Sequence, residues 1–201
     1  MKVDEYQKAS ARTLNDKPDF ELTNDQLMTI WCLTGLVGEV GELCEAVIFS
    51  ESFSVKNDKD WFEKVLKIKK EIGDNFWYLA GICTKQRLSL SEIVNNSFGE
   101  DVWTPITIEV KQLQYVYSLR NLLLAVCRIS ENIKKGIFHQ HGINQVDLRR
   151  DIKAIYLTLK IIAENFGLDI FEIMQDNIDK LLIRFSKGFN SQDSIKRVDV
   201  K

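Results

Sequence analysis

The chain has 201 residues, of which 45% are hydrophobic and 28% charged, and its formal net charge is −2. This composition is typical of a soluble globular protein with one or two domains. The balanced charge argues against a nucleic-acid polymer or an anionic membrane as partner, and no apolar run approaches the roughly 20 residues of a membrane span.

The N-terminal residues and the cysteines indicate where in the cell the protein is expected. The N-terminal residues lack the apolar core of a signal peptide. The cysteines form no CxxC pair and each lies in an apolar segment, so we expect reduced core residues in a cytoplasmic protein: Cys32, Cys44, Cys83 and Cys127.

Apolar residues recur at spacings of three and four along almost the whole chain, which predicts helices. The expected ranges are 4–14, 24–50, 61–86, 89–96, 109–135, 146–165 and 169–187. Residues 51–60 form an expected polar connection, and residues 98–107, with a glycine and a proline, form the clearest break. No segment alternates with period two for long, so we predict an all-α helical bundle.

Two of these helices carry clear apolar stripes. In the second helix the stripe comprises Leu27, Ile30, Trp31, Val37, Val40, Leu43, Cys44 and Val47. In the third helix it comprises Val65, Ile68, Ile72, Phe76, Leu79 and Cys83.

The sequence also contains a weak internal repeat. Residues 87–98 match residues 167–178 at an offset of 80, and each segment follows a long helix. We therefore expect two halves of similar plan, residues 1–98 and residues 107–201. They should pack as one unit, because a helix hairpin cannot bury its apolar face alone.

Acidic residues form a repeated pattern on the second and third helices. Glu39 and Glu42 are spaced i, i+3, and so are Glu71 and Asp74. Each pair projects from one side of its helix, so antiparallel packing would let the four carboxylates converge. Converging carboxylates repel each other without a cation, and hard oxygen ligands suit Mg²⁺ or Mn²⁺.

Two glycines lie beside the first acidic pair. Gly38 and Gly41 each cost about 1 kcal/mol of helix stability relative to alanine. Without side chains there, a neighbouring helix, a metal-bound water or a phosphate can approach the backbone closely.

Other interpretations of the carboxylates compete with a magnesium site. An ExxE pair on a helix is commonly a solvated face, and Glu45 is expected to be solvent-exposed or to lie outside the ligand set. A di-iron bundle would need Glu-x-x-His pairs. His139 and His141 do not have that spacing, and we interpret them as part of a loop.

Taken together, the motifs resemble those of the MazG-like, all-α nucleoside triphosphate pyrophosphohydrolases, which include dCTP pyrophosphatases and dimeric dUTPases. The family signature is ExxE, a spacer and ExxD, and here 28 residues separate Glu42 from Glu71. The opening "DEYQKASART", the segment "LSLSEIVNNSF" and the ending "NIDKLLIRFSKGF" are also similar to the family.

One departure from the family is large, because the ending appears only after the second repeat. In that repeat Glu71 falls opposite Asp151, and the first acidic pair falls opposite Arg128 and Glu131, or Ile129 and Asn132, depending on register. The resemblance therefore implies a tandem duplication with one metal site in the first half. One chain would then imitate the usual dimer, and a homodimer of whole chains is left open.

The resemblance implies Mg²⁺-dependent cleavage of a nucleoside triphosphate between its α and β phosphates. Glu39, Glu42, Glu71 and Asp74 would hold the ion, and Glu39 would orient the attacking water. The matching ending implies that Asn177, Lys180 and Arg184 contact the sugar, base or phosphates, with a solvated helix face as the alternative. The lysines at 64, 67, 69 and 70 are expected to form a solvated face.

A bound base would need an aromatic partner. The candidates are Trp31, Phe76, Trp77 and Trp103. Trp31 and Phe76 lie on the apolar stripes and are expected in the core, which leaves Trp77 as the first choice. Similarity to dCTP pyrophosphatases and dimeric dUTPases favours a deoxyribonucleotide.

Two other functions remain open at this point. The chain could be a non-catalytic nucleotide-binding or regulatory bundle that kept the fold, or a plain helical scaffold. An enzyme should release pyrophosphate, a binding protein should bind nucleotide without turnover, and a scaffold should melt at the same temperature with or without Mg²⁺ and nucleotide.

Overall fold

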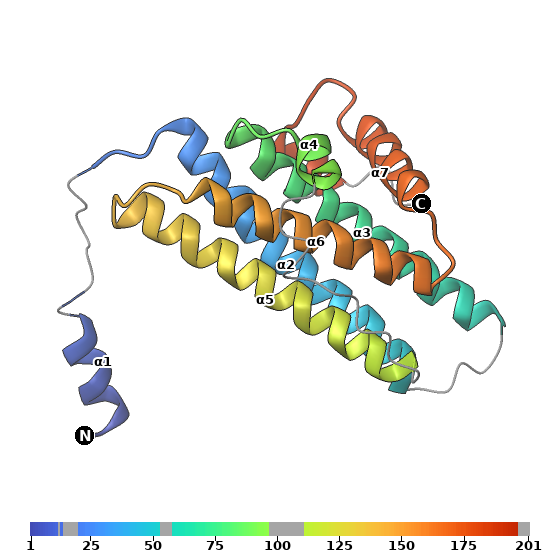
Figure 1. Ribbon diagram of the computed structural model, residues 1–201, viewed down its shortest axis with the longest axis horizontal. Helices are drawn as coiled ribbons and strands as arrows, with labels where there is room; N and C mark the ends of the chain where they lie inside the picture. Colours follow the sequence, from blue (N-terminus) through green and yellow to red (C-terminus); the bar gives the residue numbers. More distant parts are fainter. Residues whose placement is uncertain (12, 14–19, 53–57, 97–110, 197–201) are drawn as a thin grey trace.

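Four long helices form the body of the molecule in a computed structural model, which describes residues 1–11, 13, 20–52, 58–96 and 111–196. They are α2 (Asn24–Ser52), α3 (Asp58–Lys85), α5 (Lys111–Phe138) and α6 (Gln145–Asn165). Helix α2 packs on α3 and α5 packs on α6, and the two pairs meet through α2 with α5 and α3 with α6 (Figure 1). All described elements are helices, which confirms the predicted all-α class.

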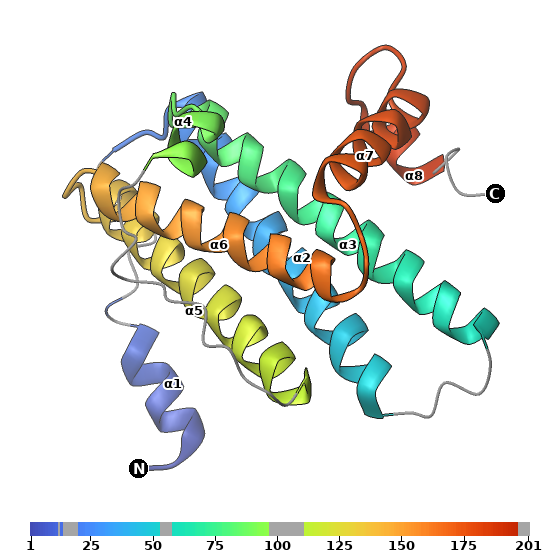
Figure 2. The same cartoon turned by 45° about the vertical axis from the view of Figure 1, so that its right-hand side comes forward.

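Four short helices surround this body. Helix α4 (Leu90–Asn95) lies on α6, and α7 (Ile170–Arg184) lies across α3. Helix α1 (Val3–Ala11) has no buried residue and stands clear of the long helices in Figures 1 and 2. Helix α8 (Ser191–Lys196) follows α7 and was not predicted from the sequence.

Most helix boundaries lie close to the predicted ones. Helix α3 begins three residues earlier than expected, and its first turn carries Asp58 and Asp60, which interact favourably with the helix N-terminus. Both ends of the expected connection 51–60 are therefore helical, and residues 53–57 lie outside the described residues. The end of the first predicted helix, the break at 98–107 and the boundary between the halves also lie outside them.

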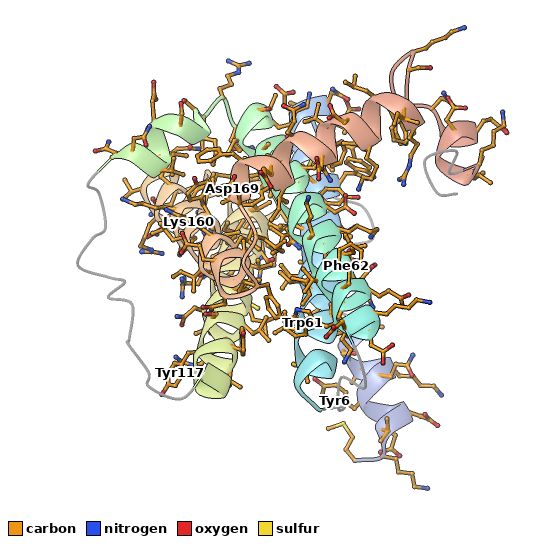
Figure 3. All side chains as sticks on the ribbon, turned by 90° about the vertical axis from the view of Figure 1, so that its right-hand side faces the viewer. Tyr6, Trp61, Phe62, Tyr117, Lys160 and Asp169 are labelled. Carbon is orange, nitrogen blue, oxygen red and sulfur yellow. The ribbon has the colours of Figure 1, made fainter. Side chains whose placement is uncertain are left out.

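One hydrophobic core joins the two helix pairs. The third-helix stripe is confirmed except at its first position: Val65 is partly buried, and the buried members are Ile68, Ile72, Phe76, Leu79 and Cys83. Side chains fill the space between the helices in Figure 3, where the labelled Asp169 marks the start of α7.

The stripe predicted for α2 is only partly correct. Val40, Leu43 and Val47 are buried, but Leu27, Trp31 and Val37 are 41–53% exposed. This helix is apolar on more than one face, so apolar spacing alone could not identify the buried face.

The cysteine prediction fails at one position. Cys32 and Cys83 are buried and Cys44 is partly buried, but Cys127 is exposed on α5. All four are free thiols, as expected.

The repeated segments share a local backbone structure. The turns after α3 and α6 each place one residue at positive φ, Arg87 at 55° and Gly167 at 70°. In both turns the following residue donates its N–H to a carbonyl five residues back, Leu88 to Cys83 and Leu168 to Ala163. This match supports the predicted duplication, which remains a prediction.

Helix α2 also meets the length and hydropathy expected of a membrane span, over Asn24–Ile48 with a mean hydropathy of 1.4. The expectation that no apolar stretch approaches this length is therefore wrong. Core helices of soluble proteins meet the same criterion, and α2 contributes Leu36, Val40 and Leu43 to the core. The cytoplasmic location and the absence of a membrane partner remain predictions.

Candidate functional site

Three of the four predicted metal-ligating carboxylates meet between α2 and α3. One oxygen each from Glu39, Glu42 and Glu71 lies within 4.8 Å of the other two. Antiparallel neighbours bring the i, i+3 positions of the two helices together here, as the sequence predicted. We call these three residues the carboxylate cluster.

Asp74 lies beside the carboxylate cluster but has its own partners on α7. Its Oδ1 accepts a hydrogen bond of 2.7 Å from Asn177 Nδ2 and also contacts Lys180 Nζ. Two residues predicted to bind substrate are therefore next to the cluster, bonded to a predicted metal ligand. Gly73 allows this contact, because a Cβ there would lie 3.0 Å from Asn177 Nδ2.

Glu39 lies in the least favourable electrostatic environment of the described carboxylates. The pKa of Glu39 is raised from 4.5 to about 7, mainly by burial and then by the charges of Asp74, Glu42 and Glu71, against the opposing effect of Lys70. Its Oε2 is buried and has no hydrogen-bond partner in the described part of the chain. A buried oxygen of this kind is costly unless it has a partner, and a cation would supply one.

Glu71 is almost completely buried, at 2% exposure, and Lys70 is its charged partner. Lys70 Nζ lies 3.0 Å from both Glu71 oxygens and 3.3 Å from Asp74 Oδ2. Burial lowers the pKa of Lys70, but hydrogen bonds and charges from Glu71 and Asp74 outweigh burial, so the pKa ends above its ordinary value. Lys70 is thus a stable cation at this site.

The donor set fits a hard divalent ion. Carboxylate oxygens are ligands of Mg²⁺ and Mn²⁺, and two oxygens bound to one Mg²⁺ at about 2.1 Å lie at most about 4.2 Å apart. The oxygens of the carboxylate cluster lie within 4.8 Å of one another, so small side-chain movements would bring them to this separation. The unpartnered Glu39 oxygen is the feature that fits an ion best.

The glycines of α2 face open space. A Cβ added at Gly38 or Gly41 would have no neighbouring atom within 4 Å, so the prediction that a helix approaches closely there is wrong. The space next to the carboxylate cluster is free for water or a ligand. Gly35 differs, because the Tyr78 ring would lie 2.2 Å from its Cβ.

An aromatic group adjoins the carboxylate cluster along α2 and α3. Trp31 makes edge contacts with Trp77, Tyr78 and Phe189, at centroid distances of 5.6–6.3 Å. Tyr78 connects the two features: burial raises its pKa most, followed by the charges of Glu39 and Asp74. Trp31 and Glu39 are eight residues apart on one helix, or about 12 Å along its axis.

The other predicted site residues have different environments. Glu45 is exposed outside the carboxylate cluster, as expected. The Arg184 guanidinium lies 5.9 Å from the Phe185 ring centre. His139 and His141 follow α5 in an exposed loop. Trp103 lies outside the described residues.

Sequence reasoning misjudged three of the residues at this site. The lysine run was expected to be solvated, but Lys70 reaches into the acidic group; its spacing of i, i+4 from Asp74 was an available signal. Phe76 is buried as expected, but Trp31 is 41% exposed in the aromatic group. Phe189 joins that group from the segment after α7, which no helical pattern indicated.

Comparison with protein-family models, with curated proteins and with solved structures found no match to this chain, so the site is interpreted from its own geometry and from the motif resemblance.

Proposed function

We propose that the protein is a Mg²⁺-dependent nucleoside triphosphate pyrophosphohydrolase that produces a nucleoside monophosphate and pyrophosphate. One observation carries this proposal. The carboxylates of Glu39, Glu42 and Glu71 converge, and the buried Oε2 of Glu39 has no hydrogen-bond partner in the described part of the chain. The order of the acidic motifs, ExxE before ExxD, supports the reaction through the family resemblance alone.

Each side chain has a role that its environment supports. Glu39, Glu42 and Glu71 would hold the ion, and Asp74 would complete the set once it is released from Lys180. A bound Mg²⁺ would neutralise charge on the phosphates. Glu39 would also orient the attacking water as general base.

The aromatic group would bind the base. Trp31 is 41% exposed and its partner Trp77 is partly buried, and stacking of a base on such rings is tolerant of base identity. The preference for a deoxyribonucleotide rests on the resemblance alone, and the homodimer remains a prediction.

Pyrophosphate release from a panel of dNTPs and NTPs with Mg²⁺ tests the proposal. Glu42→Gln should lower the rate by about 100-fold or more, a loss typical of removing a group that acts in the transition state. Glu45→Gln is the matched control, because Glu45 is also exposed on α2 but lies outside the carboxylate cluster. Equal rates for the wild type and Glu42→Gln would contradict the proposal.

One observation favours a non-catalytic nucleotide-binding bundle as the second candidate. Lys70 and Lys180 already neutralise part of the acidic group without an ion. Such a protein would bind nucleotide but release no pyrophosphate across the panel.

A further inference from the structure

Lys70 occupies a place that the motif resemblance does not explain. It follows Lys69 and precedes Glu71 on α3, yet its ammonium group touches two of the predicted metal ligands, Glu71 and Asp74. Lys69, by contrast, turns away to Asp176 on α7. The position of Lys70 within the acidic group therefore does not simply follow from a lysine-rich helix face.

An ion bound to Glu71 and Asp74 would lie close to the positive charge of Lys70, which contacts the same two carboxylates. Both Glu71 oxygens bond to Lys70, and Asp74 is shared between Lys70 and Lys180. A divalent ion that binds Glu71 and Asp74 would repel the Lys70 ammonium group and favour its movement away from these carboxylates. The displaced ammonium then needs another anion, because a charged group that leaves an ion pair in a partly buried site loses stabilisation.

Space for that anion lies next to Lys70. A pocket of about 160 Å³ between α3 and α7 is lined by Lys69, Lys70, Gly73, Asn177 and Lys180, among others. Asp176 also lines the pocket and pairs with Lys69, which leaves the ammonium groups of Lys70 and Lys180 as the cations that could bind phosphate oxygens. A phosphate there would receive the two ammonium groups that the ion displaces.

The geometry points to Lys70 as a tethered counter-ion that couples metal binding to phosphate binding. This inference rests on the proposed function and adds its regulation. A metal ion alone competes with Lys70 for Glu71 and Asp74, whereas a metal ion and a triphosphate together give every charge a partner. Divalent ion and nucleotide therefore bind synergistically.

Calorimetric titration of Mn²⁺ into the full chain at pH 8 tests the coupling, with and without an α,β-methylene deoxynucleoside triphosphate that cannot be cleaved. For the wild type, the nucleotide should tighten Mn²⁺ binding by about tenfold, within the usual range of coupling between sites. Lys70→Met should bind Mn²⁺ alone about tenfold more tightly and lose most of this coupling. Lys67→Met, an exposed neighbour on the same helix, should behave as the wild type.

Two further variants keep the test decisive. Lys70→Gln replaces Lys70→Met if the latter does not fold, and Lys70→Arg retains the charge and should preserve the coupling. Unchanged Mn²⁺ affinity and coupling in the neutral variants would overturn the inference, leaving Lys70 as a structural partner of Glu71.

The outcomes also separate this inference from the proposed function. If the wild type releases pyrophosphate, and the neutral Lys70 variants show the same coupling of Mn²⁺ and nucleotide binding as the wild type, only the inference is overturned. Altered Mn²⁺ affinity in Lys70→Met, in a protein without turnover, would support the counter-ion role and contradict the enzyme. Absence of Mn²⁺ binding in every variant would overturn both.

Discussion

The two helix pairs each bury one carboxylate at matching positions, but they neutralise it differently. Glu71 on α3 and Asp151 on α6 are 80 residues apart, are 2% and 1% exposed, and each follows a basic residue. Glu71 faces Glu39 and Glu42 from α2. Asp151 instead accepts a 2.8 Å hydrogen bond from Arg128 of α5 and one of 3.1 Å from Arg150.

This contrast shows that the facing helix determines how the charge of the buried carboxylate is neutralised. Arg128 reaches Asp151 from α5, whereas Glu39 and Glu42 face Glu71 from α2. A guanidinium neutralises the buried acid permanently, whereas a second carboxylate leaves a charge for something else to neutralise. Among the described residues, Glu39, Glu42 and Glu71 are the acidic side chains that lie close enough to share a metal ion.

Removing the two arginines should produce the largest change in stability. Arg128→Met with Arg150→Met leaves Asp151 buried without its two cations, which should cost about 3 kcal/mol or more of unfolding free energy. Urea denaturation measures this loss. Adding Asp151→Leu should recover most of it, because the unpaired charge is then gone. A loss below about 1 kcal/mol would mean that water reaches Asp151 and the pair is not structural.

Glycine substitutions should act in opposite directions in the two helix pairs. Gly136→Ala on α5 places a Cβ 2.8 Å from the backbone nitrogen of Ile143 and should destabilise the protein by about 1–3 kcal/mol. Gly38→Ala and Gly41→Ala meet no neighbour and should each stabilise it by about 0.5–1 kcal/mol.

Melting temperatures measure both effects, and nucleotide titration separates stability from function. A ligand that lies over the open backbone of α2 would bind more weakly to Gly38→Ala despite its higher melting temperature. Equal binding to both proteins would show that the ligand does not approach this part of α2.

The smallest expected effect is on how the stability of the ion-free protein depends on pH, which should change when Glu39 is replaced. The pKa of Glu39 is about 7 in the folded protein, above its ordinary 4.5, because of burial and the charges of Asp74, Glu42 and Glu71, opposed by Lys70. Between these values the folded state holds a proton that the unfolded chain has lost. Stability should therefore fall as pH rises from about 4.5 to about 7, with the full penalty above that window.

Urea midpoints in EDTA at pH 5 and pH 8 test this sign. Glu39→Gln should lose part of the pH dependence, whereas Glu45→Gln should keep it. A wild-type midpoint that rises between these values, to the same extent in Glu39→Gln, would show that Glu39 titrates normally.

Much of the fold could be predicted because strong helical periodicity depends on local sequence. The buried face of α3 was predicted correctly, since its polar and apolar residues segregate clearly. The exposure of Trp31 and Val37 could not be predicted, because α2 is apolar on several faces and its neighbours decide which face is buried. Helix α8 is six residues long and has no apolar stripe to reveal it.

The candidate site was predictable in its residues but not in its contacts. The i, i+3 spacing places Glu39, Glu42 and Glu71 correctly once the two helices pack antiparallel. It does not reveal that Asn177 and Lys180 bond to Asp74, because those contacts join residues more than 100 positions apart. Nor does it distinguish Lys70, whose direction depends on the burial of Glu71.

The bonds from α7 to Asp74 have a consequence for how the protein is made. Asn177 and Lys180 emerge late in synthesis, 103 and 106 residues after the aspartate they contact. A ribosome that stops before this helix leaves Asp74 without either partner, and an incomplete product carries extra unbalanced negative charge at the surface where α7 would dock. Helix α7 thus completes the surroundings of an aspartate that was translated about 100 residues earlier.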